Sequence, residues 1–352
     1  MVSRIIALLL IFCLCLPVAG CAPREPGKIY IYGENHINPD ITSQELELWQ
    51  SYYHEQGMRH LFIEYAYYHA AFLNAWMQAE DDSILVDFYN DLVGTQAHTE
   101  YTLDFFRAIK ETCPETIFHG TDVGHQFSTT GKRYLEYLED NGLIDTQEYQ
   151  LTLEAIDQGK QYYGDGKQDH VYRENTMTQN FIREFETLNG ESIMGIYGTA
   201  HIYPDSLNHT GECDSMGKQL VGHFGGEYIF SEDLTAAVQA KKQPLREETL
   251  TIGKKDYTAE YFGSWTVSES YHGYSEVEFW RLPDAFDDFS KSEPTGTFRG
   301  STHYPFPVEE GGAYVVQFLY QDGRKLRTYY LCDGMLYNDV LVTKEIRGTS
   351  IG

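Results

Sequence analysis

Short β-prone runs alternate with amphipathic helical stretches from residue 28 to about residue 230, and this alternation limits the fold more than any other feature of the chain. The β runs cover residues 28–32, 60–64, 116–119, 192–197 and 227–230. The helical stretches cover residues 43–56, 66–77, 102–111, 132–139, 146–159 and 168–188. We expect the first to be capped by Thr42 or Ser43 and ended by Gly57. Strands that alternate with helices form parallel sheets with helices on their faces, so we predict a mostly parallel α/β domain over residues 28–245.

The sequence changes character beyond Lys241. Further β runs cover residues 249–254, 276–281, 314–320, 325–331 and 335–346, with almost no helical pattern between them. Residues 321–324 and 332–334 are predicted hairpin turns, because Gly323 and Gly334 accept the positive φ that such turns require. We predict a smaller antiparallel β-rich domain over residues 246–352. Its role stays open between a binding module and a lid or dimerisation element.

The first 21 residues have the pattern of a bacterial lipoprotein signal. Arg4 precedes an apolar run that is too short to span a bilayer comfortably, and Val18-Ala19-Gly20 places small residues directly before Cys21. This pattern resembles the lipobox, in which the cysteine thiol is lipidated after cleavage. We expect residues 1–20 to be a signal peptide and residues 21–27 a lipidated tether. The protein would then be anchored to the cell membrane and face outside the cytoplasm. An ordinary signal peptide is the alternative.

The chain is strongly acidic, with a net charge of -27 that becomes -28 when Arg4 leaves with the signal. Such a surface repels nucleic acid and anionic headgroups, so no nucleic-acid partner is expected. Besides Cys21, the predicted mature chain contains Cys113, Cys213 and Cys332. Their spacing matches no metal or redox motif, and one disulfide among them is compatible with the sequence.

Ionisable residues follow each of the first four β runs. These residues are Glu34, His36, Glu64, Asp122, His125 and His201. Ligands of open α/β sheets bind beyond the carboxyl ends of the strands, so we expect these side chains to meet in one cleft.

Gly-x-x-His sequences end at His36, His60, His201 and His303, but only His36 and His201 directly follow a β run of the α/β domain. We therefore interpret His60 and His303 as structural. In the helical stretch 168–188, Arg173, Met177 and Asn180 are spaced to share one face. This stretch immediately precedes the strand that delivers His201, which favours an Arg173 side chain directed into the cleft over one in solvent.

The ordered set of these motifs resembles a clan of proteins that includes the erythromycin esterase-like hydrolases, the TraB/TIKI proteins and the ChaN-type haem-binding lipoproteins. The resemblance covers residues 28–230 only. The matching residues are Gly33, His36, Glu64, Gly120, Asp122, Arg173, Glu174, Met177, Asn180, Gly198 and His201. Esterase members usually end the last strand with Asn-x-His, whereas Gly198-Thr199-Ala200-His201 is closer to the TraB/TIKI form. TIKI-like members resemble metal-dependent peptidases, and ChaN-like members resemble haem carriers with a tyrosine ligand.

A hydrolase that activates water is the leading interpretation, because no β run of the α/β domain is followed by a Gly-x-Ser-x-Gly sequence or by a cysteine. In this hypothesis His36 is the general base and is oriented by Glu64 or Glu34. Arg173 stabilises an oxyanion or binds a substrate carboxylate, and His201 is the general acid or a second polarising group. The substrate would be a small molecule or a peptide.

Two alternatives use the same cleft. In one, His36, His201, Glu64 and Asp122 hold a divalent transition metal, with His125 as an extra ligand. In the other, the protein binds haem or iron without catalysis, through Tyr65, Tyr67, Tyr68 or His69, although ordinary aromatic packing also explains that cluster. A catalytically inactive adhesion or assembly lipoprotein is a third interpretation. Outside the cytoplasm there is no supply of ATP or nicotinamide, which favours hydrolysis or ligand capture over cofactor chemistry. The sequence does not indicate an oligomeric state.

Overall fold

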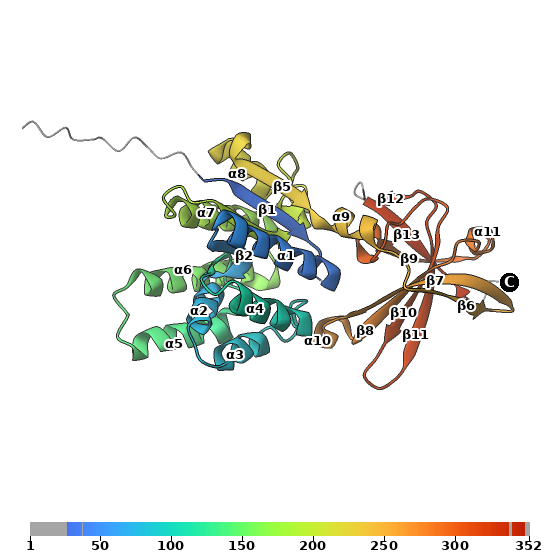
Figure 1. Cartoon of the computed structure of the whole chain (residues 1–352), viewed down its shortest axis with the longest axis horizontal. Coiled ribbons are helices and arrows are strands. Elements are labelled where there is room, and N and C mark those ends of the chain that lie inside the picture. Colours follow the sequence, from blue (N-terminus) through green and yellow to red (C-terminus); the bar gives the residue numbers. More distant parts are fainter. Residues whose placement is uncertain (1–26, 37, 338–339, 349–352) are drawn as a thin grey trace, which may run out of the picture.

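The structure is a computed structural model that describes residues 27–36, 38–337 and 340–348 (Figure 1). Cys21, the predicted lipidation site, lies outside these residues. The described chain forms a five-stranded parallel sheet flanked by helices, followed by a separate eight-stranded sheet. The predicted fold class, α/β followed by an antiparallel β-rich part, is confirmed.

The parallel sheet has the strand order β3-β2-β4-β1-β5. Its strands are β1 (Ile29–Glu34), β2 (His60–Ala66), β3 (Ile117–Asp122), β4 (Ile193–Gly198) and β5 (Ile229–Asp233). Each overlaps one of the predicted β runs. Since β4 lies between β1 and β2, the residues that follow these three strands meet at the centre of one sheet edge.

Helices cover both faces of this sheet. Those of the α/β part are α1 (Pro39–Gln56), α2 (Tyr67–Met77), α3 (Ser83–Asp91), α4 (Glu100–Thr112), α5 (Lys132–Asp140), α6 (Gln147–Tyr162), α7 (His170–Glu186), α8 (Met216–Phe224) and α9 (Leu234–Lys241). Side chains alternate along the strands, so Leu61 and Ile63 of β2 pack towards the core under α1 to α4, while Phe62 packs towards α7 and α8. None of the helices among the described residues is long and apolar enough to cross a membrane.

The start of α1 differs from the prediction. The expected cap at Thr42 or Ser43 is wrong, because the helix begins one turn earlier at Pro39. Asn38 is the N-cap, and its side chain accepts a hydrogen bond from the backbone N–H of Asp40. Proline suits the first helical position because it has no N–H that would need a partner there. The expected end at Gly57 is confirmed by its left-handed backbone, with φ of 73°.

The second sheet has the order β12-β13-β11-β10-β8-β7-β6, and β9 pairs with β13. Its strands are β6 (Arg246–Ile252), β7 (Lys255–Thr266), β8 (Glu276–Arg281), β9 (Pro294–Gly300), β10 (Ala313–Leu319), β11 (Lys325–Leu331), β12 (Leu336–Tyr337) and β13 (Val340–Ile346). Strands β7 and β9 were not predicted. The turn at residues 321–324 joins the paired strands β10 and β11 as expected, but residues 332–334 are not a hairpin turn, because β12 pairs with β13 and not with β11.

The two parts of the chain contact each other through polar groups. The short helix α10 (Glu269–His272) lies near α3 and α4 (Figure 1), and Ser270 Oγ accepts a hydrogen bond of 2.9 Å from the backbone N–H of Gly94. On a second contact, Asn35 Nδ2 donates to the carbonyl of Thr302 over 2.8 Å. The other short helix, α11 (Phe286–Phe289), packs within the β-rich part. Cys113, Cys213 and Cys332 are all free, so they form no disulfide.

Candidate active site

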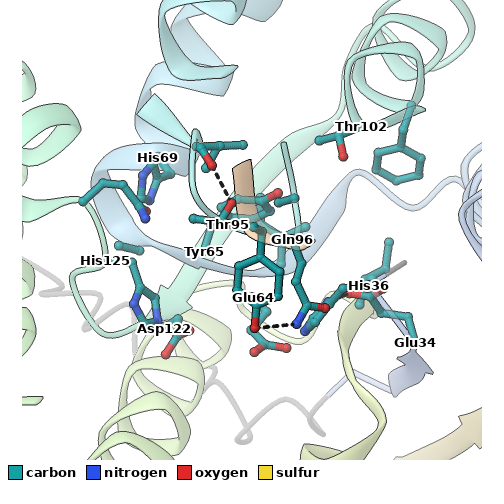
Figure 2. A pocket seen from close by; sticks show the side chains of 18 of the residues that line it. Glu34, His36, Glu64, Tyr65, His69, Thr95, Gln96, Thr102, Asp122 and His125 are labelled. Atoms are coloured by element: carbon teal, nitrogen blue, oxygen red, sulfur yellow. Dashed lines mark hydrogen bonds and ion pairs between the residues drawn. The ribbon is translucent and has the colours of Figure 1, made fainter. Parts of the chain in front are cut away.

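A cavity of about 480 Å³ lies at the carboxyl ends of the parallel strands (Figure 2). Its charged wall consists of Glu34, His36, Glu64, Asp122, His125 and Arg173. The remaining lining residues come mainly from α1, α2, α4, α10 and the loop 92–97. The ionisable residues that line it are Glu34, His36, Glu45, Glu64, Tyr65, His69, Tyr101, Asp122, His125, Tyr163, Arg173 and Tyr271. The volume is in the range that is typical of small-molecule sites.

Arg173 is at the centre of the charged wall. Its Nε lies 3.0 Å from Asp122 Oδ1, and its Nη2 lies 2.6 Å from Asp122 Oδ2 and 2.5 Å from Glu64 Oε1. The guanidinium therefore joins carboxylates that are 51 and 109 residues away in the sequence. No hydrogen bond of Nη1 is found within the described ranges, and Arg173 lines the cavity.

Glu64 is ionised and held from two sides. Its Oε2 accepts a hydrogen bond of 2.5 Å from the backbone N–H of Gly198, and its Oε1 lies 3.5 Å from Nε2 of His201. Burial alone would raise the pKa of Glu64, but the charges of His201, Arg173 and His36 outweigh burial and lower it to about 2. Such a carboxylate is a fixed negative charge and a weak base.

His201 lies behind Glu64 and is not among the residues that line the cavity. Its Nδ1 is 2.7 Å from Glu174 Oε2, and Glu174 Oε1 accepts a hydrogen bond from the backbone N–H of Met216. Burial alone would lower the pKa of His201. The negative charges of Glu64 and Glu174 have the larger combined effect and raise the pKa above its usual value. His201 therefore contacts Glu64 on one side, and Glu174 holds its Nδ1 on the other.

The sequence suggested either Glu64 or Glu34 as the residue that orients His36. In the structure His36 pairs with Glu34. Its Nδ1 contacts Glu34 Oε1, and the His36 side chain is 41% exposed. The charge of Glu34 outweighs burial and raises the pKa of His36 above its ordinary value of 6.5. A Cβ atom at Gly198 would lie 3.4 Å from His36 Nε2 and 3.3 Å from Glu64 Oε2, so glycine lets both groups come close to β4.

Asp122 connects the Arg173 ion pair to a second histidine. Its Oδ2 lies 2.9 Å from His125 Nε2, and His125 Nδ1 lies 2.5 Å from the hydroxyl of Tyr163. Burial would raise the pKa of Asp122, but Arg173 and His125 lower it well below its usual range. His125 therefore lines the cavity as a partner of Asp122.

The remaining sequence-predicted residues of α7 support the site from behind. Met177 is fully buried in the core beneath α7 and α8. Asn180 donates a hydrogen bond of 3.0 Å to the carbonyl of Thr121, the residue before Asp122. Neither residue lines the cavity. His60 and His303, which we interpreted as structural, do not line it either.

The donor groups of the predicted metal set are arranged around Arg173. Among residues 27–36, 38–337 and 340–348, no group of three or more His, Cys, Asp or Glu side chains is arranged to hold a metal ion. The guanidinium lies between Glu64 and Asp122 and forms an ion pair with each, and Nδ1 of His36 contacts Glu34. This arrangement does not fit a metal centre.

Only part of the Tyr65–His69 cluster that was considered for iron binding lines the cavity. Tyr65 lines the cavity, as does His69, whereas Tyr67 and Tyr68 do not. Tyr68 is fully buried, and its hydroxyl donates to the carbonyl of His125. Tyr68 therefore stabilises the loop that follows β3.

Several lining residues were not found from the sequence. Glu45 and Thr42 lie three residues apart on α1 and face the cavity together, a spacing that the sequence does contain. Tyr101 comes from α4, and its hydroxyl donates to the carbonyl of His36. Tyr271 comes from α10 of the β-rich part and accepts a hydrogen bond of 3.2 Å from Gln96 Nε2. No local pattern marks Tyr271, because its place depends on contact between two distant segments.

Comparisons with known proteins show only distant likeness of fold. No family model matches the chain, and no curated protein matches it. A succinoglycan biosynthesis protein matches at 14% identity with a TM-score of 0.43, covering 58% of this chain and 65% of that chain, which is less than two thirds of its length. A Bacillus cereus protein matches at 11% identity with a TM-score of 0.45, covering 92% of this chain and 86% of that chain. An erythromycin esterase mutant in its open conformation matches at 10% identity with a TM-score of 0.42, covering 64% of this chain and 73% of that chain. All three TM-scores are below 0.5, and the matches do not assign a family.

Proposed function

We propose that the protein is a hydrolase that cleaves an ester or amide bond with water activated by His36. The observation that carries this proposal is the His36–Glu34 pair at the cavity. Glu34 holds Nδ1, and Nε2 lies beside Gly198 at the carboxyl end of β4. A carboxylate that holds Nδ1–H leaves Nε2 as the basic nitrogen, which is the arrangement a general base requires.

The reaction follows from these contacts. Glu34 raises the pKa of His36 to about 10, so the reactive form is the one in which His36 has lost its proton. In this form Nε2 takes a proton from water while the water oxygen attacks the carbonyl carbon of the substrate. The resulting oxyanion is stabilised by the positive charge of Arg173. The two carboxylates bind Nε and Nη2 of Arg173, so Nη1 can contact the substrate. The bond to the leaving oxygen or nitrogen then breaks, and His36 returns its proton to the leaving group. Glu64, Asp122 and His201 hold Arg173 and its surroundings in place.

We further propose that this chemistry takes place at the outer side of the cell membrane. The support is the lipobox pattern that ends at Cys21, which lies outside the described residues. A tether of residues 21–27 is short, so the cavity would stay close to the membrane surface.

The proposal is tested with purified protein that begins at Ala22. Hydrolysis of p-nitrophenyl acetate and of an N-acyl p-nitroanilide is measured for the native chain, for His36→Ala and for His54→Ala. We expect His36→Ala to lower kcat by about 10²–10⁴-fold, as the loss of a general base does. His54 is exposed on α1, so His54→Ala should leave the rate unchanged.

Equal rates for the native chain and His36→Ala would refute the proposal. The haem alternative is examined in the same preparation by adding haemin. A shifted Soret band at one-to-one stoichiometry, without hydrolysis of either substrate, would replace hydrolysis by haem binding as the function.

A further inference from the structure

Two buried side chains at the cavity have polar atoms without a hydrogen-bond partner. Glu45 is 4% exposed and His69 is 0% exposed. Within the described part of the chain, Glu45 Oε1 and both ring nitrogens of His69 are unpartnered. Buried polar atoms are almost always paired, because leaving one unpaired costs free energy. Since Glu45 and His69 both line the cavity, a bound molecule can supply the missing partners.

The two side chains reach the cavity at separate points. Glu45 comes from α1 and is close enough to Glu34 and His36 to interact with both electrostatically. His69 comes from α2 and interacts in the same way with His125. In Figure 2, His69 lies on the side of the cavity opposite to His36 and Glu34. A ligand that pairs with both must therefore carry polar groups at two places.

Both side chains favour their uncharged form. Burial and the nearby charge of Glu34 raise the pKa of Glu45 well above its ordinary value. Burial, with His125 and Arg133, lowers the pKa of His69 to about 3. An uncharged carboxyl and an uncharged imidazole each offer one donor and at least one acceptor.

This donor and acceptor pattern selects the chemistry of the ligand. A hydroxyl group both donates and accepts, so it matches either side chain. A carboxylate only accepts and would also lie near the negative charges of Glu34 and Glu64, whereas an ammonium group only donates. Aromatic rings from Tyr65, Tyr101 and Tyr271 also line the cavity and offer apolar surfaces for the ring of a ligand.

We propose that the cavity binds a neutral, hydroxyl-rich ligand, a sugar or a comparable polyol, whose hydroxyl groups pair with Glu45 and His69. The inference goes beyond the proposed hydrolysis, because it holds whether or not the bound molecule is cleaved. Binding is therefore measured without turnover.

The first experiment tests whether the polar atoms are unpartnered in the free protein. His69→Phe and Glu45→Met remove them while keeping similar volume, so each variant should raise Tm, by about 2–4 °C for a domain of this size. Ser292→Ala is the matched control, since Ser292 Oγ is an unpartnered buried atom of the β-rich part. It should raise Tm without changing ligand binding. A lower Tm for both His69→Phe and Glu45→Met would overturn the proposal.

The second experiment measures binding of neutral mono- and disaccharides to the chain from Ala22 by saturation-transfer NMR. D-Glucuronate and D-glucosamine serve as the charged counterparts of D-glucose. We expect at least one neutral sugar to bind, with affinity reduced about tenfold or more in His69→Phe and Glu45→Met. Glu45→Gln keeps a donor and an acceptor and should retain binding. The proposal is overturned if no neutral sugar binds at millimolar concentration, if the charged sugars bind as tightly, or if the two variants bind like the native chain.

Discussion

Arg173 binds Asp122 with two nitrogens, Nε at 3.0 Å from Oδ1 and Nη2 at 2.6 Å from Oδ2. The Asp122 side chain is 1% exposed and that of Arg173 is 15% exposed, so both charges are largely removed from water. Two parallel contacts to a planar guanidinium fix the orientation of both groups. Helix α7 and strand β3 are thereby held together at the cavity.

Asp122→Ala should destabilise the protein strongly, because it leaves the buried charge of Arg173 with only Glu64 as a partner. We expect the free energy of unfolding to fall by about 3–5 kcal/mol, measured by urea denaturation. Glu136→Ala is the control, since Glu136 pairs with Lys132 on the exposed surface of α5 and should matter by less than about 0.5 kcal/mol. Similar losses in the two variants would contradict a stabilising role for this ion pair.

Acid should destabilise the protein partly through Glu64. Its pKa in the folded state, about 2, is below that of an unfolded glutamate, so the folded state binds fewer protons. The stability it contributes is present above the unfolded pKa and is lost as the pH falls towards 2. Urea denaturation of Glu64→Gln between pH 6 and pH 2 should therefore show a weaker dependence on pH than the native chain. An unchanged dependence would mean that Glu64 is not held as a charge.

Glu34→Gln should change the pH dependence of hydrolysis. A general base acts in its deprotonated form, so the rate should rise with pH through the pKa of His36. Glu34 raises that pKa, and its neutral replacement should lower it. The acidic limb of kcat/KM against pH should then move to lower pH, with a lower maximum rate because Nδ1 is held less firmly. An acidic limb at the same pH in both proteins would mean that Glu34 does not raise the pKa of His36.

Tyr271→Ala should weaken substrate binding more than it slows the chemical step. Tyr271 lines the cavity, and among the described residues we find no hydrogen bond between it and the charged wall. We expect KM to rise about tenfold, equivalent to one lost side-chain contact, while kcat stays close to native. Tyr337→Ala is the control, since Tyr337 is 63% exposed in the same part of the chain. A fall in kcat at constant KM would assign Tyr271 a different role.

Cys21→Ala should release the protein from the membrane fraction. Lipid anchoring requires the thiol of this residue, and the remaining chain is strongly acidic and repelled by anionic headgroups. Fractionation of expressing cells followed by immunoblotting measures the change. Cys15→Ala alters a cysteine of the apolar run and should stay membrane-bound. Release of both variants, or of neither, would refute lipidation at Cys21.

The sequence predicted the fold class because its two periodic patterns differ along the chain. Strand β2 illustrates the reason, since an apolar run that ends in a charge, Glu64, is typical of a buried parallel strand. Strand β7 (Lys255–Thr266) was missed because its polar and apolar residues alternate imperfectly across a bulge at residues 261–264. Helix α3 is short and has only Leu85 and Phe88 buried, too few residues to establish a helical period.

The charged wall of the site could be predicted from the sequence because of the topology of a parallel sheet. His36, Glu64 and Asp122 lie at or near the carboxyl ends of different strands, and parallel strands place these ends together. Glu45 was not accessible, because an acidic residue on an amphipathic helix is normally expected at the surface. Its burial depends on α4, which packs against α1 and contributes the far wall of the cavity. The division of roles between Glu34 and Glu64 likewise depended on side-chain distances.

Asn35 lies in the sequence between Glu34 and His36, the proposed base. Its side chain donates a hydrogen bond to the carbonyl of Thr302. A rotation of the β-rich part relative to the parallel sheet would therefore pull on the peptide that joins Glu34 to His36. The second sheet is in this way connected, through one side-chain hydrogen bond, to the segment that carries the proposed base. Substitutions near Thr302, outside the charged wall, would therefore reach the proposed base through this contact.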